Sequence, residues 1–324
     1  MELLKRSFFG GKAAKIQFFA IIIAIVVLFF VPNFGSAYLP LFLAWVITYA
    51  VMSLAWTLFS GKTGYVSLAS AAFYGTGMYV QAALGSNLPI VVSMIIAAAA
   101  SFGVAFGIGL VTLRLRGVYF TIFTFGLSLF LNKFIHWYEV KFFHTKGHMV
   151  LAYDNLTVYY CVLVVFAIFL LVVIPMNKSR FGLALDCIGQ NEDSAQHVGV
   201  NTTMTKVLAF AVSAAPVGAV GAAMATTIGY VDPDIAFKLL ASFMPVLMAI
   251  FGGTHSVYGP IVGAIVFYSL QDYLLRELPG AYMIIFGCVM VAVILLMPKG
   301  IFGVIDTIIA RRKRGFDGEV IGDV

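Results

Sequence analysis

Charge is the property this sequence has least of. Of its 324 residues only 10% are Asp, Glu, Lys or Arg, while 62% are hydrophobic. Soluble domains carry about 25% charged and about 45–50% apolar residues, which excludes an ordinary soluble globule. Apolar runs recur from end to end, and no soluble catalytic module is expected among them. We therefore predict one membrane domain, residues 1–324, with short cytoplasmic tails at 1–15 and 298–324.

Cysteine is scarce, and basic residues are not gathered into a nucleic-acid-binding face. Cys161, Cys187 and Cys288 are far apart and follow no metal-ligand spacing, so neither a disulfide framework nor a cysteine metal site is predicted. The net charge of +6 comes without a basic surface interleaved with aromatic residues. Nucleic-acid binding is therefore not expected.

Patterns typical of catalysis are missing as well. There is no Gly-x-Ser-x-Gly, and the apolar runs hold no acid and histidine constellation for an intramembrane hydrolase, so no catalytic residues are predicted. Gly61-Lys62-Thr63 resembles the end of a phosphate-binding loop, but Trp56 stands where that loop needs its first glycine. Energy for any active transport must then come from another polypeptide.

A histidine pair offers the one candidate metal site. His144 and His148 are four residues apart, with His136 nearby. Such a pair shares a metal when it lies on a helix, but Gly147 and Lys146 disfavour both a helix and a bound cation. We expect a solvated loop and no metal site.

Apolar runs of membrane-spanning length are abundant. Counted against the roughly 20 residues that cross a bilayer, they predict an all-α integral membrane protein of about ten transmembrane helices, with eight to ten as the range. The predicted spans are 16–32, 38–59, 65–84, 88–111, 117–135, 156–176, 207–230, 239–253, 259–272 and 280–297. The third, eighth and ninth are short or rich in small residues, which makes them candidates for broken or re-entrant segments.

The basic residues set the orientation. Of the 20 Lys and Arg residues, five fall on the outer side when the N-terminus is inside: Lys133, Lys141, Lys146, Lys238 and Arg276. Because cytoplasmic loops carry the excess of basic residues, both termini are predicted to be cytoplasmic. No predicted span holds a fixed charge in its hydrocarbon portion, which weakens the case for an ion-driven pump. Na⁺ sites built from carbonyl oxygens stay open.

The longest predicted cytoplasmic loop, residues 177–206, carries the clearest local signals. A short amphipathic helix is predicted over 180–189, where a glycine stops it. Asn201 or Thr202 can cap the next span.

A second short helix is predicted in the middle of this loop. Asn191 can serve as its N-cap, with Glu192 and Asp193 in the first turn, where the helix dipole favours anions. Gly199 suits the position just after its end. Two interpretations are open: an ordinary interfacial loop helix, or a coupling helix that docks in a cleft of a motor protein and transmits force to the spans.

Five segments resemble, in order, one family of transport proteins. They are residues 61–77, 113–121, 189–210, 251–260 and 297–300. Within the third, Asp193-Ser-Ala195-Gln-His-Val-Gly199 looks like the Glu-Ala-Ala…Gly signature of ABC importer permeases. The ordered set resembles the M-type permeases of branched-chain amino-acid importers.

This sequence also departs from the family pattern at three places. Asp193 stands for the usual glutamate, Thr254-His255-Ser256 replaces Gly-Ser, and the outer loop around residues 144–149 lacks the usual turn. The last departure leaves the substrate and the docking partner open.

The resemblance implies a heteromeric importer in the cytoplasmic (inner) membrane of a prokaryote. A second homologous permease would complete the pore, two ATP-binding cassette subunits would dock below it, and an extracytoplasmic binding protein would deliver substrate. This chain would bind no cofactor itself, since the ATPases would bind ATP and Mg. The residues expected to couple to those ATPases are Glu192, Asp193, Ala195, Gln196, His197 and Gly199.

A path for an amino acid with an apolar side chain needs apolar walls and a few neutral hydrogen-bonding groups. The hydroxyls that fit are those of Ser67, Ser70, Thr76, Thr121 and Thr124, although hydrogen bonds to their own helix carbonyls explain each equally well. Alternative functions are an importer for urea or short amides, a stand-alone secondary transporter or channel, and a membrane scaffold. The scaffold has no positive support in the sequence.

Overall fold

The computed structural model describes residues 23–34, 38–85, 87–144, 146–254, 256–296 and 300. The predicted tail at 1–15 lies outside the described residues, and so does the predicted tail at 298–324 except for residue 300. Residues 16–22 of the first predicted span, residue 297 of the tenth and His255 lie outside them as well.

The described chain is a bundle of helices. In chain order they are α3 (Leu39–Trp56), α4 (Ser70–Leu84), α5 (Ile90–Thr112), α6 (Val118–Tyr138), α7 (Asn155–Asn177), α8 (Arg180–Gln190), α9 (Glu192–His197), α10 (Thr202–Ile228), α11 (Pro233–Ala236), α12 (Leu240–Gly252), α13 (Tyr258–Glu277) and α14 (Tyr282–Leu296). Residues 23–30 are also helical. Three short stretches are not α-helical: η1 (Val31–Phe34) is a 3₁₀ helix, and η2 (Thr57–Gly61) and η3 (Glu139–Phe143) are π-helices.

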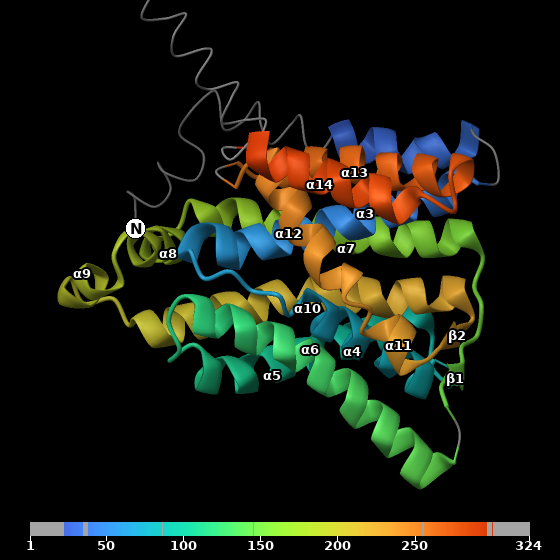
Figure 1. Ribbon diagram of the computed structural model, residues 1–324, viewed down its shortest axis with the longest axis horizontal. Helices are drawn as coiled ribbons and strands as arrows, with labels where there is room; N and C mark the ends of the chain where they lie inside the picture. Colours follow the sequence, from blue (N-terminus) through green and yellow to red (C-terminus); the bar gives the residue numbers. More distant parts are fainter. Residues whose placement is uncertain are drawn as a thin grey trace, which may run out of the picture.

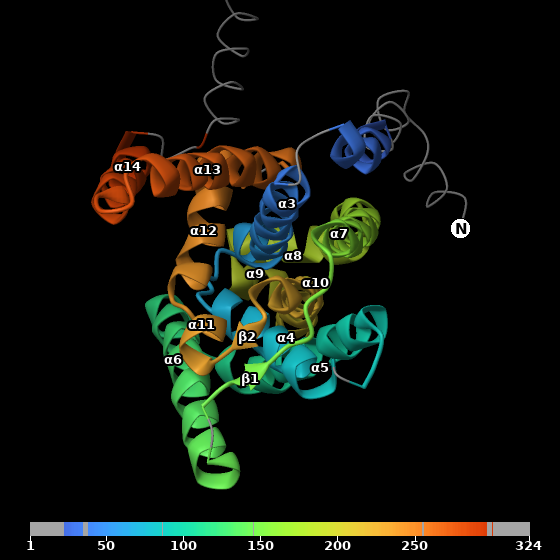
Figure 2. The ribbon, with the colours of Figure 1, turned by 90° about the vertical axis from the view of Figure 1, so that its right-hand side faces the viewer.

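Helix α10 occupies the centre of the bundle, with α4 and α5 on one side and α3 and α7 on the other (Figure 2). Its sequence explains this place, because small residues let neighbouring backbones approach closely. A Cβ added at Gly77 of α4 would overlap the main chain at Gly218 of α10, and one added at Gly221 would overlap the carbonyl of Tyr74. Helices α12 and α13 pack beside α3, and α14 packs against α12 and α13.

Six helical stretches among the described residues are long and apolar enough to cross a membrane: Leu39–Gly61, Ile90–Thr112, Val118–Phe142, Asn155–Asn177, Thr202–Ile228 and Pro233–Gly252. The prediction of an all-helical integral membrane protein is confirmed, whereas ten spans and cytoplasmic termini are not. The ninth predicted span forms α13, whose C-terminal part carries Asp272 and Arg276. The first and tenth predicted spans reach into residues outside the described ranges.

Charged residues lie inside several of the helices. Lys206 is in the second turn of α10 and is buried, while Lys133 belongs to α6 and Asp272 to α13. The ends of a helix follow its caps rather than its last apolar residue. At α10 the Asn201 side chain accepts a hydrogen bond from the Met204 amide and starts the helix before Lys206.

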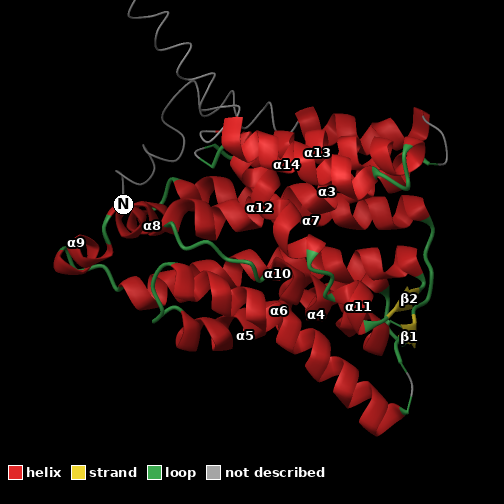
Figure 3. Cartoon of the chain, viewed as in Figure 1, coloured by secondary structure: helices red, strands yellow, loops and turns green. Residues whose placement is uncertain are grey.

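The third predicted span is broken, as its composition suggested. After η2 the chain leaves the helix, and residues 64–69 run back into the bundle without regular structure before α4 begins at Ser70 (Figure 3). Helix α4 therefore has only 15 residues and starts in the middle of the bundle (Figure 1).

A two-residue antiparallel ladder marks one end of the bundle. Strand β1 (His148–Met149) pairs with β2 (Tyr230–Val231), with His148 opposite Val231. We call this the strand end. Helices α8 and α9 lie at the opposite end, called the loop end (Figure 1).

Candidate functional site

The loop end is built from two capped helices. Helix α8 follows Ser179, whose hydroxyl accepts a hydrogen bond from the Gly182 amide at 3.4 Å. Helix α9 follows Asn191, whose Oδ1 accepts from the Ser194 amide at 2.9 Å. The predicted N-cap at Asn191 is therefore confirmed. The extended backbone of Asn191 turns the chain between α8 and α9, which would otherwise continue as one helix.

Helix α9 ends in a Schellman motif centred on Gly199. The Val200 amide donates to the Ala195 carbonyl at 3.1 Å, and the Gly199 amide donates to the Gln196 carbonyl at 2.9 Å. Gly199 has a φ of 90°, a conformation that glycine adopts without the steric cost a Cβ imposes. The predicted position of Gly199 just after the helix is confirmed, and it fixes where the chain turns back toward α10.

The six residues predicted to couple to a partner do not share one face. The Glu192 carboxylate is directed into the protein, where only 13% of the side chain is exposed, and Ala195 is buried. Asp193, Gln196, His197 and Gly199 are exposed. Val198, which the sequence did not single out, is 85% exposed.

Glu192 reaches a lysine that is buried at the start of α10. Lys206 Nζ donates to Glu192 Oε1 at 2.6 Å and to the Leu113 carbonyl at 3.2 Å, and it lies 3.2 Å from the Tyr65 hydroxyl oxygen. An ammonium has three donors, so each one has an acceptor here. The Tyr65 hydroxyl in turn donates to Glu192 Oε2, and the Lys206 ammonium lies 4.4 Å from the Tyr65 ring centroid.

This cluster keeps a charge pair stable where water is scarce. Only 2% of the Lys206 side chain is exposed, and a buried charge is tolerated when its partner and its other hydrogen bonds replace water. Burial opposes ionisation of Glu192, but the hydrogen bonds from Lys206 and Tyr65 outweigh it and lower the pKa of this carboxyl below its ordinary value. Glu192 is therefore ionised at neutral pH.

Two further contacts tie the loop helices to the bundle. Lys62 Nζ lies 2.8 Å from Asp186 Oδ1 of α8. Arg116, in the turn after α5, pairs with Asp193 Oδ1 at 3.1 Å, and both side chains of this second pair are largely exposed. The Lys62 pair is the more protected of the two, since only 16% of that lysine side chain is exposed.

The sequence reasoning missed Tyr65, Lys206 and Asp186 as members of this site. Lys62 was expected only to anchor a turn. One local signal was available: Lys206 stands directly before an apolar run, where a lysine that becomes buried needs a partner, and the preceding short helix carries the acids Glu192 and Asp193. The other contacts join residues 77 to 141 positions apart, and no local pattern reports them.

The non-helical residues 64–69 obtain their hydrogen bonds from side chains of neighbouring elements. Thr121 Oγ1 donates to the Val66 carbonyl at 2.9 Å, Thr124 Oγ1 accepts from the Leu68 amide at 3.1 Å, and Ser128 Oγ donates to the Leu68 carbonyl at 3.3 Å. All three hydroxyls belong to α6. Irregular backbone at membrane depth requires such internal partners, because lipid supplies none.

More partners come from α3, η2 and α12. Trp56 Nε1 donates to the Ser67 carbonyl at 2.8 Å, and the Ser67 amide donates to Ser60 Oγ at 3.1 Å. The Ala71 amide at the start of α4 donates to Ser242 Oγ at 3.2 Å. Residues 65–69 are thus held largely by side chains, whereas the Gly64 amide donates to the Ser60 carbonyl.

The five hydroxyls proposed for the path have different surroundings. Thr121 and Thr124 bond to residues 66 and 68, and Thr76 donates to the Ala72 carbonyl of its own helix at 2.7 Å. Ser67 and Ser70 line a pocket of about 20 Å³ between α3, α4 and α10. That volume suits about one water molecule.

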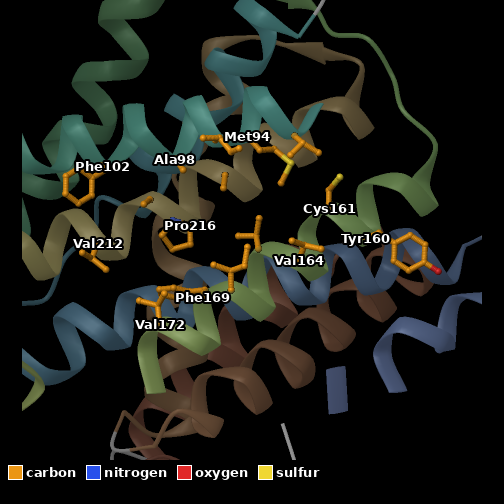
Figure 4. Close-up of a pocket in the computed structure, with 16 residues that line it drawn as sticks. Met94, Ala98, Phe102, Tyr160, Cys161, Val164, Phe169, Val172, Val212 and Pro216 are labelled. Carbon is orange, nitrogen blue, oxygen red and sulfur yellow. The ribbon is translucent and has the colours of Figure 1, made fainter. Parts of the chain in front are cut away.

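A much larger cavity, of about 570 Å³, lies between α5, α7 and α10 (Figure 4). Its walls are side chains such as Met94, Phe102, Val164 and Phe169, with Pro216 from α10. An amino acid entering it would lose water from its charged groups and find almost nothing to replace it. This cavity therefore lacks the neutral hydrogen-bonding groups that a path for an amino acid needs.

At the strand end the histidines do not form a helical pair. His144 has a φ of 52° and lies outside the helices, and His148 belongs to β1, where its Nε2 lies 3.3 Å from Glu139 Oε1. Glu139 also accepts a hydrogen bond from the Gly147 amide at 3.1 Å. Within the described part of the chain, no group of three or more His, Cys, Asp or Glu side chains is placed to hold a metal.

Comparison with known proteins places this architecture in a family. Residues 38–294 match the family model described as "Branched-chain amino acid transport system / permease component". The chain belongs to this family. It is therefore a transport-system permease component, a multi-pass protein of the inner membrane and not an enzyme. The resemblance seen in five sequence segments is confirmed.

Curated relatives of this permease include two from Escherichia coli (strain K12). The branched-chain amino acid permease protein LivM is 25% identical over 293 residues, covering 78% of this chain and 67% of LivM. The permease protein LivH is 24% identical over 283 residues, covering 79% of this chain and 91% of LivH. The xylose permease protein XylH of Haemophilus influenzae is 27% identical over 130 residues, 39% of this chain and 35% of XylH. No solved structure gives a significant match.

Proposed function

We propose that this chain is one of two permease subunits of an ABC importer that carries branched-chain amino acids across the inner membrane. Two separate ATPase subunits bind ATP and Mg and energise it, and an extracytoplasmic binding protein delivers leucine, isoleucine or valine. The observation that carries the proposal is α9. The outer face of this short helix is exposed, while Glu192 on its inner side is bound to Lys206 and Tyr65 of the helical bundle.

The loop end faces the cytoplasm in this proposal. Asp193, Gln196, His197 and Val198 present an acid, an amide, an imidazole and an apolar side chain side by side. The Schellman turn at Gly199 and the buried Glu192 hold this face in one orientation, so a push on α9 reaches the bundle.

The path for the amino acid follows residues 64–70 and their neighbours. Ser67 and Ser70 there offer neutral hydrogen-bonding groups beside Phe73, Phe210 and other apolar walls. No fixed charge lines this small pocket, which suits a zwitterion that must leave as readily as it enters. The volume of about 20 Å³ corresponds to a closed state, and transport opens it.

Branched-chain amino acids are the favoured cargo because LivM and LivH are named for them. The partial similarity to a protein named for xylose transport makes the cargo a question for experiment. Reconstitution of this chain with its second permease, its ATPases and its binding protein in proteoliposomes tests it directly. We expect ATP-dependent uptake of labelled leucine, isoleucine or valine, and none of urea, acetamide or xylose.

Two outcomes would contradict the proposal. Uptake by the purified chain alone, driven by an ion gradient, would indicate a secondary transporter. ATP-dependent uptake of urea or a short amide in place of leucine would assign the chain to a different importer.

Charge reversal on α9 tests the coupling role. Asp193→Lys is expected to abolish uptake while membrane insertion and assembly continue, because Asp193 is exposed and supports no buried contact. Glu277→Lys makes the same change at an exposed acid at the end of α13 and is expected to keep wild-type uptake. Normal uptake by Asp193→Lys would remove α9 from the coupling interface.

A further inference from the structure

The loop helices hold the turn after η2 at three points. Lys62 Nζ pairs with Asp186 of α8. Gly189 of α8 lies so close to the Lys62 carbonyl that a Cβ would overlap it. Tyr65 donates to Glu192 of α9. The two loop helices therefore contact the same short turn, α8 at Lys62 and α9 at Tyr65.

Lys206 connects the loop helices and the turn at residues 62–65 to α5 and α10 of the bundle. Its ammonium bonds to Glu192 on α9, to the Leu113 carbonyl at the end of α5 and to the Tyr65 hydroxyl. Four segments thus meet at one buried side chain. A displacement of α9 cannot leave this pair behind, because an unpaired buried charge is costly.

The segment that follows the turn is suited to move. Residues 66–69 lie outside any helix, and hydroxyls of Thr121, Thr124 and Ser128 on α6 supply their hydrogen bonds. A hydroxyl both donates and accepts and rotates to suit its partner, so such bonds break and re-form one at a time. A continuous helix would have to break its backbone ladder to make the same movement.

We propose that Lys206 and Glu192 are positioning residues that transmit the displacement of α9 to residues 62–69, and that residues 62–69 are the moving part of the path. The inference rests on the coupling function proposed above. It adds the route that force takes: from α9 through one buried ion pair to a broken helix, with the lipid-facing helices left in place.

The test uses the assembled importer in proteoliposomes with its binding protein, with uptake of labelled leucine and ATP hydrolysis measured in the same vesicles. The variant is the double change Glu192→Leu with Lys206→Met, because apolar residues of similar volume replace a buried pair without leaving a charge behind. The matched control is Lys133→Met, at an exposed lysine of α6.

We expect the double variant to assemble and hydrolyse ATP while its leucine uptake per ATP falls about tenfold, within the usual range of coupling energies. Lys133→Met is expected to keep the wild-type ratio. A residue with a merely structural role would lower hydrolysis, assembly and uptake together, so the ratio separates the two roles.

Cysteine labelling follows the moving segment directly. Val66 is 40% exposed, and a Val66→Cys chain with its three native cysteines replaced by serine reports the surroundings of that segment. Its maleimide labelling rate is expected to differ between the nucleotide-free and vanadate-trapped importer, and the double variant should remove that difference.

The outcomes separate this inference from the proposed function. A wild-type complex with no ATP-dependent amino-acid uptake refutes the proposed function. A wild-type complex that transports, together with a double variant of unchanged uptake per ATP, refutes only the inference. Labelling of Val66→Cys that changes equally with and without the ion pair also refutes it.

Discussion

Replacing Lys206 with Met removes the cation at the centre of the contact between α9 and α10. The neighbouring groups remain: Glu192, the Tyr65 hydroxyl and the Leu113 carbonyl. Methionine fills a similar volume, so the change tests charge and hydrogen bonding more than packing.

The structure sets the expected size of the effect. Removing one partner of a buried ion pair costs about 3–5 kcal/mol. Glu192 keeps a hydrogen bond from Tyr65, and 13% of its side chain stays exposed, which favours the lower end. A loss of about 3 kcal/mol lowers the folding equilibrium constant on the order of 100-fold.

Two further variants make the assay specific. Unfolding in mixed micelles with a rising fraction of denaturing detergent, followed by tryptophan fluorescence, gives the free energy of unfolding of each chain. The double change Glu192→Leu with Lys206→Met is expected to lie within about 1 kcal/mol of the wild type, because no unpaired charge remains. The exposed control Lys133→Met is expected to change stability by less than about 0.5 kcal/mol.

The ranking of the variants by free energy of unfolding tests whether the Glu192–Lys206 pair holds α9 to the bundle. If Lys206→Met is as stable as Lys133→Met, the ion pair does not hold α9 to the bundle. If the double variant is less stable than Lys206→Met, packing rather than charge dominates the contact.

Three other measurements follow from the same contacts. Gly189→Ala should destabilise the chain, because the added Cβ would overlap a main-chain carbonyl, whereas Gly126→Ala, with open space around it, should not. Thr124→Val leaves the Leu68 amide without its partner and should cost about 1–3 kcal/mol, with Thr124→Ser restoring stability. Acid should weaken the fold through Glu192, whose pKa lies below its ordinary value of 4.5: its contribution is complete above pH 4.5 and is lost as the pH falls through the folded pKa. Unfolding measured from pH 7 to pH 3 should show this loss, and Glu192→Gln should remove it.

Local rules predicted the loop end well. Asn191, Asn201 and Gly199 act where capping chemistry put them, because a cap depends only on the residues within one turn of it. The broken third span was also foreseen from its glycines and small residues. Each of these features depends on a few neighbouring residues, which a sequence displays directly.

The membrane spans were predicted less well. Apolar windows located the long helices, but they ended each one at its last apolar residue and placed Lys206 in a loop. A buried lysine is stabilised in a helix by a partner elsewhere in the chain. A hydropathy window cannot detect such a partner, because it averages only over neighbouring residues.

The sequence alone determined that this protein lives in lipid, since a chain with so little charge cannot cover a water-exposed surface. It also determined the short helix between the sixth and seventh predicted spans, and the family resemblance that the comparison confirmed. Only the tertiary structure decided which way Glu192 faces and what it meets. The structure brings together four residues that are far apart in the chain: Tyr65, Leu113, Glu192 and Lys206. Their contacts stabilise the fold because they are buried, since an unpaired charge is costly only where water cannot reach it.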